Sequence, residues 1–250
     1  MRLFWITLFA FFTVDTLSQE IHPFVKEAQQ LERQFNDQAA LNKYLEASKA
    51  QPGQITTICK ISELYSVLGK RQKSKEQEKA YNKAAKQYAE QALRMNPNSS
   101  DANFVMSVAM GRAALSESGQ AKINAVKDIK RYAEKAIQLD PGNARAYHVL
   151  ARWHLEVSSL SSFEKWLVKV TFGALPAASL DDAIKYYEKS KQLNPQLLQN
   201  YLDLARCFQK KEEETKALTF LQLLQKMPAN NTEEQWVKQE GSKLLKELQD

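Results

Sequence analysis

The sequence predicts an all-α fold, a solenoid of stacked helical hairpins, on three observations. Four prolines each stand five residues after a small residue: Pro52, Pro97, Pro141 and Pro195. Mostly apolar or small residues follow each proline at positions six, nine, ten and thirteen, a spacing that places them on one helical face. With seven glycines, seven prolines and no alternating β-branched run, the chain has little room for strands.

The stretch 132–157 contains the clearest example of this pattern. Its first helix ends at residues 140–143, Asp-Pro-Gly-Asn, because proline lacks the amide that a continuing helix needs and its neighbours suit a tight turn. A second helix follows at once, and Tyr147, Leu150, Ala151 and His154 fall on one of its faces. Because His154 stands at a core position, we expect it to be packed rather than to act as a base.

This pattern resembles the tetratricopeptide repeat, a helical hairpin of about 34 residues. The most complete match is 198–231, and a degenerate first unit fits 21–54. The resemblance implies a right-handed superhelical solenoid of about five hairpins with a C-terminal capping helix, all within residues 19–250. The expected units are 21–54, 55–99, 100–143, 144–197 and 198–231, with the cap at 232–248.

The spacing of the units is irregular. Successive intervals between the four prolines are 45, 44 and 54 residues, all longer than the repeat of about 34 residues. We expect the excess of each unit to lie between its two helices. The cap is expected to begin with a capping box of Thr232 and Gln235, and Gly241 within it should cost about 1 kcal/mol.

The amino terminus has the features of a targeting segment. Arg2 gives a positive start, residues 3–14 form an apolar run, and a small-x-small site follows at 16–18. Residues 1–18 are therefore predicted to be a signal peptide, and the protein to be exported, either periplasmic or secreted. The alternative is an uncleaved segment that anchors the protein to a membrane at its N-terminus.

The longest insertion, residues 158–180, predicts an amphipathic helix with a wide apolar side. Such a helix could close over an apolar ligand or contact a membrane peripherally. It could also fold back and pack against its own repeat. In the ligand hypothesis the residues that form a lid are Phe163, Trp166, Val170 and Phe172.

The repeat resemblance also implies a binding groove formed by the first helices of the units. The residues that it places there are Phe104, Arg112, Arg145, His148, Arg152, Arg206 and Lys210. Arginine captures carboxylate or phosphate in a bidentate manner, so the expected ligand is an acidic peptide, a partner protein or a lipid head group. The competing interpretation is that these arginines only pair with local acids such as Glu156 and Asp203.

Several short sequence motifs and the long insertion resemble one particular family, the regulator of microtubule dynamics family, over roughly residues 85–248. The motifs are Arg152-Trp153, residues 157–161, Glu164-Lys165, the turn with Pro176 before Asp182-Ala183, and Pro228-Ala229 followed by Thr232-Glu233-Glu234. The resemblance implies an adaptor, with microtubule association in some members and lipid accommodation at organelle contacts in others. The export-type start departs from the family and argues against microtubule binding.

The sequence holds no pattern for catalysis, a metal or a cofactor. The three histidines lack metal spacing, and no HExxH, CxxC, GxSxG or phosphate-binding glycine loop occurs. The basic stretch 70–94 is better explained as a solvated helix face than as a nucleic-acid site, since only Tyr81 and Tyr88 could stack on bases. We therefore expect a non-enzymatic adaptor; the alternative is a carrier for a lipid or another apolar ligand.

Overall fold

A computed structural model describes residues 22–249, which form twelve α-helices and no strand. The all-α solenoid is confirmed, and the predicted signal peptide lies outside the described residues. The helices are α1 (Pro23–Arg33), α2 (Asp37–Ala50), α3 (Ile55–Lys70), α4 (Lys75–Met95), α5 (Ser100–Ser116), α6 (Gly119–Leu139), α7 (Ala144–Ser158), α8 (Ser162–Phe172), α9 (Leu180–Leu193), α10 (Leu198–Lys210), α11 (Glu214–Lys226) and α12 (Thr232–Glu247).

The helices stack as five hairpins followed by the single helix α12. The hairpins are α1–α2, α3–α4, α5–α6, α7–α9 and α10–α11, with α8 inserted in the fourth. The residues that precede the prolines by five positions are almost fully buried: Ala47, Ala92, Ala136 and Ser190. Small side chains let two helix backbones approach closely, and the Ser190 hydroxyl also donates a hydrogen bond of 2.7 Å to the carbonyl of Ala144.

The extra residues of the second and third units lengthen their helices, so the expectation of insertions between the helices was wrong there. Helix α4 and helix α6 each have 21 residues, against 13 for α11. The turns between the two helices are short, at residues 71–74 and 117–118. The two helices of each of these units are simply longer, and the units still stack as the others do.

Only the fourth unit carries a true insertion, made of α8 and the segment 173–179. Gly173 ends α8 with a positive φ of 81°, a conformation that favours glycine. Ser179 then caps α9, since its hydroxyl accepts a 3.0 Å hydrogen bond from the amide of Asp182. His154 is buried, as predicted, and its Nδ1 lies 3.4 Å from the amide nitrogen of Ser179. Residues 173–179 therefore lead the chain from α8 back to α7, so that α9 can complete the fourth hairpin.

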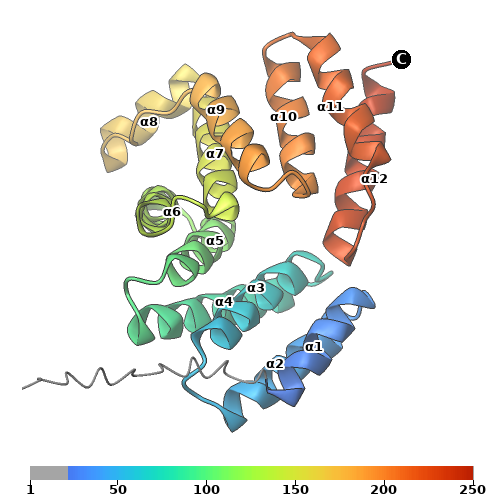
Figure 1. The fold of residues 1–250 in the computed structure, drawn as a ribbon. Coiled ribbons are helices and arrows are strands. Elements are labelled where there is room, and N and C mark those ends of the chain that lie inside the picture. Colours follow the sequence, from blue (N-terminus) through green and yellow to red (C-terminus); the bar gives the residue numbers. More distant parts are fainter. Residues whose placement is uncertain (1–21, 250) are drawn as a thin grey trace, which may run out of the picture.

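The last helix returns to the first units of the solenoid (Figure 1). The Nζ of Lys70 lies 2.8 Å from a carboxylate oxygen of Glu233 and 3.3 Å from the centroid of the Trp236 ring. The hydroxyl of Thr232 donates a 3.3 Å hydrogen bond to the carbonyl of Phe35, 197 residues away in sequence. We call these contacts the clasp: they join α12 to the turn that follows α1, at Phe35, and to the end of α3, at Lys70.

Helix α12 begins differently from the predicted capping box. The cap is Asn231, whose side chain accepts a 2.9 Å hydrogen bond from the amide of Glu234, so Thr232 is left free for the clasp. Gly241 also has a packing role. A Cβ at this position would lie 2.5 Å from a methyl carbon of Leu224, which is fully buried. The glycine allows α12 to approach α11 closely.

The change Gly241→Ala should therefore destabilise the protein although alanine is the better helix former. Alanine gains about 1 kcal/mol of helix propensity, but overpacking against a buried leucine costs about 1–3 kcal/mol. Chemical denaturation should show a net loss of about 1 kcal/mol. The matched control is Gly111→Ala in α5, where the nearest atom would be 3.9 Å away; this change should stabilise, and a stabilising Gly241→Ala would contradict the packing role.

The change Glu233→Lys should open the clasp, because it replaces an attraction to Lys70 by a repulsion. Small-angle scattering should then report a larger radius of gyration while circular dichroism reports the same helix content. Glu214→Lys, the same charge change at an exposed site on α11, serves as the control. Identical scattering curves for the Glu233 variant and the wild type would rule out the clasp.

Candidate functional site

The predicted groove residues lie on the first helices of three successive units. Phe104 and Arg112 belong to α5, Arg145, His148 and Arg152 to α7, and Arg206 and Lys210 to α10 (Figure 1). Spacings of three, four, seven and eight residues place such side chains on one helical face. The structure divides these seven residues into those already engaged by neighbouring side chains and those that are not.

Arg145 is engaged on all sides. Its two terminal nitrogens lie 2.7 Å from Glu63 and 3.1 Å from Asp101, and its guanidinium carbon lies 4.3 Å from the centroid of the Phe104 ring. Burial lowers the pKa of Arg145, but Glu63 and Asp101 outweigh burial and raise the pKa overall. Phe104 is itself buried. Arg145 therefore ties α3, α5 and α7 together through acids of two other units.

His148 and Arg206 share one buried acid. The Nδ1 of His148 lies 2.8 Å from the side-chain oxygen of Asn200, and its Nε2 lies 3.7 Å from Asp203. Arg206 donates a 3.0 Å hydrogen bond to Asp203 and also lies 4.0 Å from Glu240 of α12. Burial lowers the pKa of His148 more than Asp203 raises it. These two residues serve internal contacts between α7, α10 and α12.

Arg112 is the groove arginine that is left with the least compensation. Within residues 22–249, Arg112 has no carboxylate within 4 Å. Burial and then the charge of Arg152 lower its pKa, and the more distant charges of Glu233 and Glu78 only partly oppose them. Arg152 lies 3.7 Å from Glu156, and this pair contributes little because its side chains are 52% and 66% exposed. Burial lowers the pKa of Arg152, but the charge of Asp203 and those of Glu156 and Glu233 outweigh burial and raise the pKa overall. The two guanidinium groups thus repel one another on neighbouring helices.

A third cation completes this cluster. Burial lowers the pKa of Lys70, and the charges of Arg112 and Arg152 lower it further, whereas Glu233 opposes them. Side chains from α3, α5, α7 and α12 therefore converge within electrostatic reach. We call Lys70, Arg112 and Arg152 the inner basic patch. Lys70 was predicted to belong to the solvated basic stretch 70–94, whereas it lies against Glu233 and Trp236 of α12. Nothing in the sequence marks Glu233 as its partner, because the two residues are 163 positions apart.

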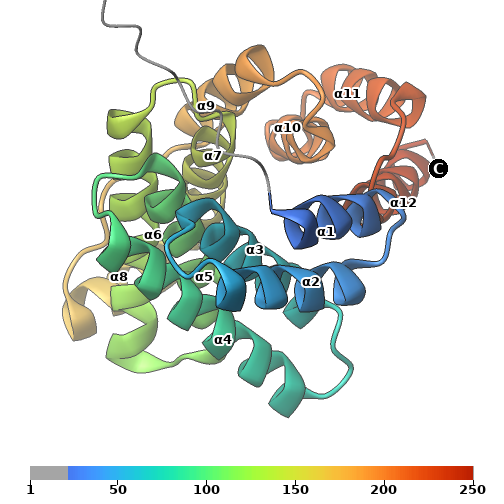
Figure 2. The same ribbon diagram turned by 60° about the horizontal axis from the view of Figure 1, so that its bottom comes forward.

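Lys210 and the insertion lie apart from the inner basic patch. Lys210 is exposed at the last residue of α10. Helix α8 packs against α6, in the outer layer (Figure 2), with Phe163, Trp166 and Val170 exposed and Phe172 half-buried. The structure therefore does not bring the predicted lid residues and the groove residues together.

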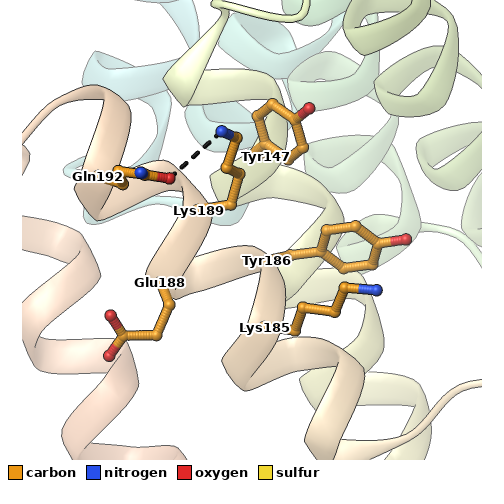
Figure 3. A pocket seen from close by; sticks show the side chains of 6 residues that line it. All are labelled: Tyr147, Lys185, Tyr186, Glu188, Lys189 and Gln192. Atoms are coloured by element: carbon orange, nitrogen blue, oxygen red, sulfur yellow. Dashed lines mark hydrogen bonds between the residues drawn. The ribbon is translucent and has the colours of Figure 1, made fainter.

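A surface pocket between α7 and α9 is also separate from the inner basic patch. Its volume is about 680 Å³, and Figure 3 shows the rings of Tyr147 and Tyr186 on one side and Glu188 directed away from them. Lys189 donates a 3.3 Å hydrogen bond to Gln192 across its upper edge. The two tyrosine ring centroids are 6.3 Å apart, as in ordinary packing between aromatic side chains.

The described residues contain neither a membrane span nor a metal cluster. In residues 22–249, no helix has the length and hydropathy to cross a bilayer. Over the same part of the chain, no three His, Cys, Asp or Glu side chains converge as metal ligands do.

The stacked hairpins and their polar inner face define a helical-repeat protein of the tetratricopeptide type. A crystal structure of a thermophilic TPR protein from Thermus thermophilus superposes with a TM-score of 0.67 at 12% identity, covering 89% of this chain and 97% of that one. The pilF structure of Pseudomonas aeruginosa gives 0.53 at 13% identity, covering 90% and 85%. At these identities the similarity establishes the fold.

Residues 24–249 match the family model described as Regulator of microtubule dynamics protein 1-3, so the chain belongs to this family. Bovine regulator of microtubule dynamics protein 1 is 28% identical over 178 residues, which are 71% of this chain and 56% of that protein. Human regulator of microtubule dynamics protein 2 is 26% identical over 174 residues, which are 69% and 42%. The chain thus spans about half the length of these relatives, and the family resemblance predicted from sequence is confirmed.

The lowered pKa of His148 predicts acid sensitivity. A histidine whose pKa is lower in the folded than in the unfolded state binds more protons when unfolded, so stability falls as pH drops below about 6.5. The melting temperature should fall between about pH 7.5 and about pH 5.5, and His148→Gln should reduce that fall. The pKa of His154 is lowered too, so part of the fall should persist. An unchanged fall in the variant would contradict this assignment.

Proposed function

We propose that this protein is a non-enzymatic adaptor that holds an acidic peptide segment of a partner protein against the inner basic patch. A repeat solenoid offers an extended inner surface for such a segment. The observation that carries the proposal is Arg112, a partly buried guanidinium with no carboxylate within 4 Å among residues 22–249. The nearby Arg152 has only the exposed Glu156 within that distance. A carboxylate placed between the two would relieve their repulsion and accept charge-assisted hydrogen bonds.

The clasp supports the same chemistry. The acidic first turn of α12 already lies against this region, with Glu233 2.8 Å from Lys70 and 3.8 Å from Arg71. An acidic segment of the chain itself is therefore accommodated at the edge of the inner basic patch. Arg112 and Arg152, farther along the stack, offer similar sites to a segment from another protein.

The alternative function, a carrier with a lipid or another apolar ligand beneath residues 158–180, finds less support. Helix α8 lies in the outer layer, and the cations of the inner basic patch come from other helices. The export of the protein, by cleavage of residues 1–18, stays a prediction, as does the alternative of an N-terminal anchor. The adaptor proposal does not depend on either.

The proposal is tested with a fluorescent oligoglutamate peptide, whose binding is followed by anisotropy. The double variant Arg112→Glu/Arg152→Glu should weaken binding about tenfold or more, since hydrogen bonds to charged groups contribute about 1.5–3 kcal/mol each. Added salt should weaken wild-type binding, because the contact is between charges.

The matched control is Arg131→Glu, the same change at an exposed position of α6. It should leave peptide affinity unchanged, and circular dichroism should show that all variants are folded. Equal affinity of the double variant and the wild type would refute the groove assignment. An oligolysine peptide that bound as tightly as oligoglutamate would refute the acidic preference.

A further inference from the structure

We propose that α8, together with the start of α6, is a docking surface for the anionic face of a lipid bilayer. The apolar side of α8 is turned to solvent, with exposed fractions of 68% for Phe163, 57% for Trp166, 45% for Leu167 and 58% for Val170. No residue of α8 is buried. Four large apolar side chains on one helix form an exposed patch of a kind that typically marks an interaction surface.

Helix α8 presents its more apolar side outward and contacts the rest of the protein by the other side. Val168 and Phe172 are only half-buried, and the tip of the Phe172 ring would lie 4.0 Å from a Cβ placed on Gly119, at the start of α6. Residues 163, 166, 167 and 170 lie on the opposite face, at spacings of three, four and seven. Figure 2 shows α8 at the edge of the molecule, beside one end of α6. The apolar side of α8 therefore does not pack against its own repeat.

The helix is stabilised by its own caps rather than by burial. The hydroxyl of Ser161 accepts a 3.2 Å hydrogen bond from the amide of Glu164, and the Glu164 carboxylate accepts a 2.7 Å bond from the amide of Ser161. This reciprocal pair is a capping box. A helix that is pre-formed at the surface can insert its apolar side without first paying for its own ordering.

The charges of α8 and of the adjoining α6 select the occupant. Four lysines of α6 and α8 have no ion pair among residues 22–249: Lys122, Lys127, Lys165 and Lys169. Of these, Lys165 donates a 2.9 Å hydrogen bond to the carbonyl of Ser158. The only acid of α8, Glu164, is engaged in the capping box. Lysines on one side of a helix with Phe, Trp and Leu on the other are typical of helices that lie in a membrane interface, where each lysine near anionic lipid adds attraction. A symmetric contact with a second copy would instead bring these lysines together.

The length of α8 fits this arrangement. Eleven residues extend about 16 Å, so the helix would lie in the plane of the interface rather than cross the bilayer. The surface is in the outer layer, whereas the inner basic patch comes from α3, α5 and α7. Docking by α8 would therefore leave the proposed peptide site accessible, and the two proposals can fail independently.

The experiment follows the fluorescence of Trp166 in the full chain. Vesicles contain phosphatidylcholine alone or equal parts of phosphatidylcholine and phosphatidylserine, with and without bromine on the acyl chains. The Trp166 signal is the wild-type emission minus that of Trp166→Phe, which keeps the other three tryptophans. With phosphatidylserine present, the Trp166 emission should shift to shorter wavelength and be quenched by bromine, and added salt should reverse both effects.

Variants then separate the contributions to docking. Phe163→Ser/Leu167→Ser should raise the lipid concentration needed for half quenching about tenfold or more. Lys165→Glu/Lys169→Glu should abolish the preference for phosphatidylserine. The control Leu223→Ser, an exposed leucine of α11 that is 44% accessible, should change neither quantity.

Two results would overturn the proposal. The first is a Trp166 signal that anionic vesicles do not change. The second is quenching that Phe163→Ser/Leu167→Ser leaves unaltered. If the vesicles have no effect but light scattering shows a dimer that the same double variant abolishes, the apolar side of α8 belongs to a contact between two copies.

Discussion

The close approach of helices at small residues is the constraint on which the rest of the structure depends. Ala47, Ala92, Ala136 and Ser190 are buried at equivalent positions of four units, where a larger side chain would separate the two helices of a hairpin or the neighbouring hairpin. This repeated contact fixes how each unit sits on the one before it. The convergence of Lys70, Arg112 and Arg152 follows from that stacking, because they belong to three different units.

The acids of the inner surface are distributed unevenly among its cations. Glu63 and Asp101 are committed to Arg145, Asp203 to His148 and Arg206, and Glu233 to Lys70. Buried or half-buried charges are costly without partners, so most of the inner surface is internally paired. Arg112 departs from this rule, and Arg152 has only the exposed Glu156 within 4 Å, which is why they, rather than Arg145 or Arg206, carry the proposal of a binding site.

The regular parts of the fold could be predicted from the sequence because proline and small-residue spacing report local packing directly. The same spacing could not tell an insertion from a longer helix, since residues 71–95 form one turn and a helix of 21 residues instead of a separate insertion. The residues assigned to the groove lie on the first helices of their units, yet which of these arginines are already paired depends on acids from other units. Glu233, 163 residues from Lys70, has no sequence signal for its partner.

The clasp gives this solenoid a property that open repeat proteins lack. In an open stack each unit contacts only its neighbours, so stability is a sum of local terms and the terminal units fray first. Here the final helix is joined to the turn after α1 and to the end of α3, so neither end is held by a single neighbour. Loosening at one terminus must disturb the other, and unfolding should be more cooperative than a linear array of the same hairpins would allow.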